Sequence, residues 1–170
     1  MDIKVKIMKY PLLVALYFFV LPTLAEDSFS IYLVRHAEKQ AVQDDPKLTP
    51  CGQLRAEQIA TMLEHTQIKH VYSTAYQRTM ATAAPFAKQQ QLAIQEYLPK
   101  KLSQFAQKLL KQKENVLVVG HSNTTPQLSA LLSAFDVEDL TEQQYRNLYQ
   151  IQVSDQGKTL TLFTQPLICQ

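Results

Sequence analysis

The chain has 170 residues, of which 46% are hydrophobic and 19% charged, and its formal net charge is +2. This hydrophobic content is too high for a disordered chain, and the length suits one compact domain. With three glycines, the sequence has no glycine-rich phosphate loop, and it has no basic block with interleaved aromatic residues of the kind that binds nucleic acid.

The N-terminal 25 residues are typical of a secretory signal peptide. Lys4, Lys6 and Lys9 precede an apolar stretch at residues 11–21, and Thr23-Leu24-Ala25 has the small residues of a cleavage site. An uncleaved membrane anchor is the alternative. A spanning helix needs about 20 apolar residues, however, and this stretch is much shorter.

Cleavage after residue 25 would leave a single domain at residues 26–170. Because cleavage removes three lysines and one aspartate, the formal net charge falls from +2 to zero. A neutral domain has no electrostatic attraction for nucleic acid. We therefore expect export across the inner membrane to the periplasm, with no stable membrane insertion once the signal peptide is gone.

Strands and helices alternate along this domain. Short apolar runs predict strands near residues 30–34, 68–73, 92–95 and 115–119. Helices are expected from Pro50, with Thr49 as the cap and a stripe of Leu54, Ile59, Met62 and Leu63, and then over 76–90, 99–113 and 124–134. Residues 148–153 and 158–163 flank Asp155-Gln156-Gly157 and predict a hairpin with a positive φ at Gly157. The pattern favours an α/β fold, a three-layer α/β/α sandwich with a mostly parallel central sheet and an antiparallel C-terminal edge hairpin.

Charged side chains follow three of the expected strands. Arg35 and His36 end the first, Arg78 comes shortly after the second, and His121 follows the strand at 115–119. If these strands are parallel neighbours, the four side chains meet at one edge of the sheet, where open α/β sheets bind their ligands. Two guanidiniums and two imidazoles suit a phosphoryl group, because an arginine fork binds phosphate oxygens in pairs.

Three segments carry a resemblance to a known family. They are Leu-Val-Arg-His-Ala-Glu at 33–38, Tyr-Ser-Thr-Ala-Tyr-Gln-Arg-Thr-Met-Ala-Thr-Ala at 72–83, and Val-Val-Gly-His-Ser-Asn-Thr-Thr-Pro at 118–126. In this order they resemble the histidine phosphatase superfamily, which is phosphoglycerate mutase-like. The resemblance covers nearly all the chain after residue 28, and the short length is similar to that of the small phosphohistidine phosphatases.

The resemblance implies a phosphomonoester hydrolase that uses neither metal nor cofactor, of the histidine acid phosphatase type. In such an enzyme His36 would attack phosphorus and form a covalent phosphohistidine, which water then hydrolyses. Arg35, Arg78 and His121 would form the phosphate pocket and stabilise the transferred group. The partner would be a small phosphorylated substrate.

The proton donor to the leaving group is less clear, because larger relatives take it from an insert that this chain lacks. Glu96 is the first candidate and Glu38 the rival, although Glu38 also fits a role in supporting the pocket or contacting substrate. Asp44 and Asp45 are more remote candidates. Ser73 is either a weak substrate contact or a helix cap. A missing acid would favour substrates with good leaving groups.

Other functions stay open at this point. One is a non-catalytic phospholigand-binding module of the cell envelope, and another is a protein phosphatase that acts on phosphohistidine. A mutase is disfavoured because the chain lacks long inserts to enclose a substrate, and a metal site built from the four histidines is weaker still. The sequence leaves the physiological substrate and the oligomeric state undecided.

Two cysteines, Cys51 and Cys169, would lie in an oxidising compartment after export. They are expected either to close a disulfide that ties the C-terminal tail to the first helix, or to remain a small helix residue and a free tail thiol.

Overall fold

The computed structural model describes residues 28–41 and 44–169. The predicted signal peptide lies outside these residues. None of the helices in the described part is both long enough and apolar enough to cross a membrane.

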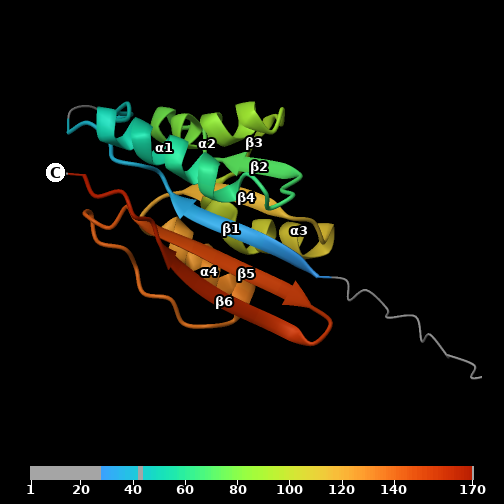
Figure 1. The fold of residues 1–170 in the computed structure, drawn as a ribbon. Coiled ribbons are helices and arrows are strands. Elements are labelled where there is room, and N and C mark those ends of the chain that lie inside the picture. The colour runs from blue at the N-terminus through green and yellow to red at the C-terminus, as the bar shows by residue number, and fades with distance from the viewer. Residues whose placement is uncertain (1–27, 42–43, 170) are drawn as a thin grey trace, which may run out of the picture.

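The centre of the fold is one six-stranded sheet in the order β3-β2-β4-β1-β5-β6 (Figure 1). Four strands are parallel to one another, and these are β1 (Phe29–Arg35), β4 (Val116–Gly120), β2 (His70–Ser73) and β3 (Ile94–Glu96). The last two strands, β5 (Asn147–Ser154) and β6 (Gly157–Thr164), are antiparallel, with β5 paired to β1. The mostly parallel sheet with an antiparallel edge hairpin is therefore confirmed.

Helices cover both faces of the sheet, as Figure 1 shows. One face carries α1 (Pro50–Leu63) and α2 (Gln77–Gln89), and the other carries α3 (Leu102–Gln112) and α4 (Thr124–Ser133). A short 3-10 turn, η1 (Pro99–Lys101), precedes α3, so the helix expected over 99–113 is split. The split follows from Lys101, whose backbone leaves the helical region at φ −121° and ψ 38°.

Helix α1 begins where the sequence predicts, but its buried face differs. The Thr49 hydroxyl accepts a hydrogen bond from the Gly52 amide at 3.0 Å, and Pro50 opens the helix. Of the expected apolar stripe, Ile59 and Leu63 are buried, whereas Leu54 is 61% exposed and Met62 is 39% exposed. Small and charged residues take the remaining buried positions, and these are Gly52, Arg55, Ala56 and Ala60.

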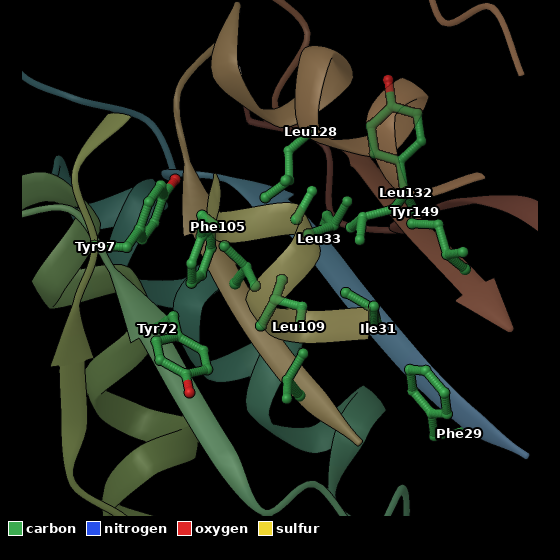
Figure 2. Close-up of a cluster of buried hydrophobic side chains, with 14 of the residues drawn as sticks. Phe29, Ile31, Leu33, Tyr72, Tyr97, Phe105, Leu109, Leu128, Leu132 and Tyr149 are labelled. Atoms are coloured by element: carbon green, nitrogen blue, oxygen red, sulfur yellow. The ribbon is translucent and has the colours of Figure 1, made fainter. Parts of the chain in front are cut away.

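Two hydrophobic clusters hold the layers together, one on each face of the sheet. Figure 2 shows the cluster beneath α3 and α4, where the ring of Tyr97 stacks on Phe105 at 4.4 Å between centroids. Burying a side chain of this size is worth about 1.5–3 kcal/mol relative to exposing it. The two clusters hold the central strands between the helix layers, and so fix the positions of the residues at the ends of these strands.

Near the C-terminus the structure confirms the predicted hairpin turn and decides between the two alternatives for the cysteines. Gly157 has a φ of +143° at the hairpin turn, a conformation that favours glycine. A disulfide joins Cys51 in α1 to Cys169 in the tail, across 118 residues of sequence. The chain after β6 is thereby tied to α1, the helix that follows the motif at residues 33–38.

Candidate active site

Four side chains meet at the carboxyl edge of the parallel strands. Arg35 is the last residue of β1 and His36 follows it, His121 comes directly after β4, and Arg78 lies in the first turn of α2. All four line one cleft of about 560 Å³. The convergence expected from the strand order is therefore present in the structure, and it brings two guanidiniums and two imidazoles around one space.

His36 is held in a single tautomer by its neighbour. Its Nδ1 lies 2.8 Å from the carbonyl oxygen of Ala37, which can only accept, so Nδ1 carries the proton and Nε2 has a free lone pair. The His36 amide donates to the carbonyl of Gly120 at 2.9 Å, which joins the ends of β1 and β4. Burial, reinforced by the charges of Arg35 and Arg78, lowers the pKa of His36 to about 3. The ring is thus neutral at neutral pH, with the lone pair of Nε2 free.

His121 is also neutral in this structure, because burial and the neighbouring Arg78 and Arg35 lower its pKa to about 4. Its ring lies edge-on to His36 with 5.6 Å between centroids, and edge-on to Tyr76 with 5.1 Å. The sequence resemblance allows a protonated or a hydrogen-bonding histidine here. The neutral form is the one that the two arginines favour when no anion lies between them.

A chain of hydroxyl groups determines which nitrogen of His121 carries the proton. The hydroxyl of Thr79 lies 2.9 Å from two backbone carbonyl oxygens, so its proton is directed to a carbonyl. It must therefore accept from Thr74, at 2.9 Å, and Thr74 in turn accepts from Nε2 of His121, at 3.0 Å. The Nδ1 atom of His121 is then the acceptor for Arg78, 3.4 Å away.

Arg35 is 2% exposed and is held by the loop between α4 and β5, residues 134–146. Its Nη1 donates to the carbonyl of Thr141 at 2.8 Å, its Nη2 lies 3.1 Å from the carboxylate of Glu142, and its guanidinium lies over the ring of Tyr145. Its Nε has no partner among the described residues. A buried donor without a partner suits an oxygen of a bound anion.

Arg78 is positioned in a similar way. Its Nη1 lies 3.5 Å from a carboxylate oxygen of Asp45, and its guanidinium lies 4.5 Å from the ring centre of Tyr76. Its Nε is also buried without a partner within the described part of the chain. Two arginines that line the cleft thus have one unsatisfied donor each.

The other residues singled out from the sequence lie outside the cleft. Glu38 binds the buried Arg55 through three contacts of 2.6 to 2.9 Å. Ser73 is buried and donates to the carbonyl of Thr74, and Glu96 is exposed at the end of β3. Asp45 touches the site only through Arg78 and the amide of Gln77.

Sequence reasoning missed one carboxylate that does line the cleft, that of Glu142. It belongs to the loop at 134–146, which carries none of the three motifs, and only the ion pair with Arg35 identifies it. Nothing in its sequence neighbourhood distinguishes it from Glu138 or Asp139 nearby. Tyr145 of the same loop packs on Arg35, with its ring centroid 6.1 Å from that of His36.

The described residues contain one group of three metal-ligating side chains whose ligand atoms lie within 4.8 Å of one another, namely Glu38, Cys51 and Cys169. The two sulfur atoms are bonded to each other, so they offer no thiolate to a metal ion.

Several solved structures resemble this chain in fold. No curated protein matches the sequence. Among solved structures, the protein histidine phosphatase SixA, complexed with tungstate, has a TM-score of 0.65 at 15% identity, over 79% of this chain and 96% of SixA. Alpha-ribazole phosphatase from Shigella flexneri has a TM-score of 0.66 at 16% identity, over 82% and 98%. Phosphoserine phosphatase from Entamoeba histolytica has a TM-score of 0.58 at 17% identity, over 81% of this chain and 97% of that chain.

At these identities the solved structures show a shared fold. A family model, described as the histidine phosphatase superfamily (branch 1), matches residues 31–98, which include the first two of the three motifs. The third motif, with His121, lies beyond the matched residues but next to His36 in space. The family model and the shared fold together confirm the resemblance to the histidine phosphatase superfamily that the motifs predict.

Proposed function

We propose that the protein is a metal-independent phosphomonoester hydrolase that works through a phosphohistidine on His36. The observation that carries this proposal is the state of His36, a neutral ring with a free Nε2, held by Ala37 in a cleft with two arginines. A nucleophile needs such a lone pair, and a phosphoryl group needs such cations. A purely structural histidine would need neither.

In the first half of the reaction, the Nε2 lone pair of His36 attacks phosphorus and forms a nitrogen–phosphorus bond. The phosphorus–oxygen bond of the ester breaks, and its electron pair leaves with the oxygen. The proton on Nδ1 stays in its hydrogen bond to Ala37, which spreads the positive charge that develops on the ring. The unpartnered Nε atoms of Arg35 and Arg78 would donate to the equatorial oxygens.

His121 supports the transferred group from the side. With Nε2 bound to Thr74, its Nδ1 is the nitrogen that faces Arg78. A phosphoryl dianion between these groups favours a second proton on His121, because it opposes the arginine charges that hold the pKa low. The protonated ring then donates to a phosphoryl oxygen. In the second half, water attacks phosphorus, the bond to Nε2 breaks, and inorganic phosphate leaves.

Hydrolysis of 4-nitrophenyl phosphate between pH 4 and 8, with a chelator present, tests this proposal. We expect turnover that survives the chelator and falls by about 10⁴-fold or more in His36→Ala. His65→Ala is the matched control, because His65 is exposed and lies outside the cleft. An acid-labile phosphoryl group on His36, seen by mass spectrometry after rapid quenching, would identify the intermediate. Turnover retained in His36→Ala, or lost on chelation, would refute the proposal.

We also propose that the protein works in the periplasm after cleavage of residues 1–25. The disulfide between Cys51 and Cys169 supports this location, since such bonds persist in oxidising compartments. Cell fractionation and mass spectrometry of the intact protein test it, with a chain that starts at Glu26 as the expected result. An uncleaved chain in the cytoplasmic fraction, with both thiols reduced, would contradict it.

A further inference from the structure

The cleft contains one carboxylate that the reaction described above does not use. Glu142 lines the cleft from the loop at 134–146, and its side chain is 72% exposed. One carboxylate oxygen lies 3.1 Å from Nη2 of Arg35, and the other accepts from the Ser122 hydroxyl at 3.5 Å. Glu142 thus contacts both the last residue of β1 and the segment that follows β4.

His36 and Glu142 lie at different depths in the cleft. His36 is 3% exposed and lies at the bottom, whereas Glu142 is largely exposed at the mouth. In an in-line displacement the leaving oxygen lies opposite the nucleophile, on the far side of phosphorus. The leaving group of a substrate on His36 therefore points toward the mouth, where Glu142 is. Glu96 is not among the residues that line this cleft.

Binding of a phosphoryl group would change the state of Glu142. The donors of Arg35 are shared in this structure between Thr141, which binds Nη1, and Glu142, which pairs with Nη2. A phosphoryl dianion competes with the carboxylate for Nη2 and adds negative charge beside it. Loss of a cation and approach of an anion both favour the protonated form of a carboxyl group. The same event that fills the site prepares a proton donor at its mouth.

We propose that Glu142 is the general acid and base of this enzyme, a proposal that rests on the phosphohistidine mechanism above. As the ester bond breaks, the carboxyl proton of Glu142 passes to the leaving oxygen, which departs as a neutral alcohol. The Glu142 carboxylate then takes a proton from the water that attacks the phosphohistidine. That water supplies the fourth oxygen of phosphate, and the electron pair of the broken bond returns to Nε2 of His36.

Leaving groups of different acidity test this role. 4-Nitrophenolate leaves without a proton, whereas phenol resembles the tyrosine side chain, with a pKa of about 10, and needs one. For Glu142→Gln we expect single-turnover phosphorylation by phenyl phosphate to slow about 100-fold, and by 4-nitrophenyl phosphate by no more than about threefold. The loss of rate at high pH that deprotonation of the acid causes with phenyl phosphate should also disappear in the variant.

Two matched variants complete the experiment. Glu138→Gln changes a carboxylate on the same loop that does not line the cleft, and should leave both substrates unaffected. Glu96→Gln changes the acid that the sequence suggests. Selective loss of phenyl phosphate turnover in Glu96→Gln, with none in Glu142→Gln, would overturn the proposal. An equal loss of rate with both substrates in Glu142→Gln would also overturn it, because the role of Glu142 would then be only to hold Arg35.

The outcomes separate this inference from the proposed function. If His36→Ala keeps its activity, the phosphohistidine mechanism is wrong and the role of Glu142 fails with it. If His36→Ala is inactive while Glu142→Gln treats both substrates alike, only the role of Glu142 is wrong. The Glu142 side chain is 72% exposed, and Arg35 keeps its hydrogen bond to the carbonyl of Thr141 in Glu142→Gln, so the variant should remain folded.

Discussion

Replacing Glu38 should destabilise the fold far more than replacing an ordinary acidic residue. The carboxylate of Glu38 contacts the guanidinium of Arg55 at 2.6, 2.8 and 2.9 Å, and the Arg55 side chain is only 1% exposed. In Glu38→Gln the arginine keeps a hydrogen bond to the carbonyl of Leu167 but loses the charge that compensates it. Removing one partner of a buried pair costs about 3–5 kcal/mol.

We expect Glu38→Gln to lower the free energy of unfolding by about 3 kcal/mol, the lower end of this range. The reason is that Glu38 is 15% exposed and the carbonyl of Leu167 still accepts from Arg55. For a domain of this size that corresponds to a Tm about 10 °C lower. Urea unfolding followed by circular dichroism, with the disulfide intact, measures the change. The midpoint should fall while the m-value stays constant.

Two further variants sharpen this test. Glu57→Gln, which changes an exposed residue of α1, should stay within about 0.5 kcal/mol of the parent. The double variant Glu38→Leu with Arg55→Met removes both charges and should recover most of the stability that Glu38→Gln loses. A loss below about 1 kcal/mol in Glu38→Gln would refute the reasoning that Arg55 needs a compensating charge.

Three other predictions follow from the same structure. Replacing Cys51 and Cys169 by serine opens a loop of 118 residues and should lower the free energy of unfolding by about 2–5 kcal/mol, which urea titration of the oxidised parent and the variant compares. In the folded protein the pKa of His36 is lowered to about 3. As the pH falls, the unfolded chain therefore takes up a proton on His36 near pH 6.5, well before the folded protein does. Stability should therefore fall by up to about 1.4 kcal/mol per pH unit below pH 6.5, and unfolding of His36→Asn at pH 7, 6 and 5 should show a correspondingly smaller fall. Gly120→Ala would bring a Cβ to 2.8 Å from the hydroxyls of Tyr97 and Thr125, so it should lower activity and cost about 1–3 kcal/mol, whereas an unchanged kcat would contradict this close packing.

Much of the fold follows from local signals in the chain. The apolar runs locate the strands, Thr49 and Pro50 locate the start of α1, and Gly157 locates the hairpin. These signals are local because capping, turn geometry and alternation depend on a few neighbouring residues. The same reasoning failed for the buried face of α1, where Arg55 is buried and Leu54 is exposed. That face depends on Glu38, which lies 17 residues earlier.

The sequence by itself determined the sheet architecture and the four residues that follow its strands. It could do so because parallel strands bring their carboxyl ends to one edge, whatever the side-chain details. Only the tertiary structure decided the tautomers of the two histidines, the pairing of Glu38 with Arg55, and the place of Glu142 beside Arg35. The last two pairs join residues 17 and 107 positions apart. No local pattern encodes such contacts, because their energy depends on burial and distance, which exist only once the chain has folded.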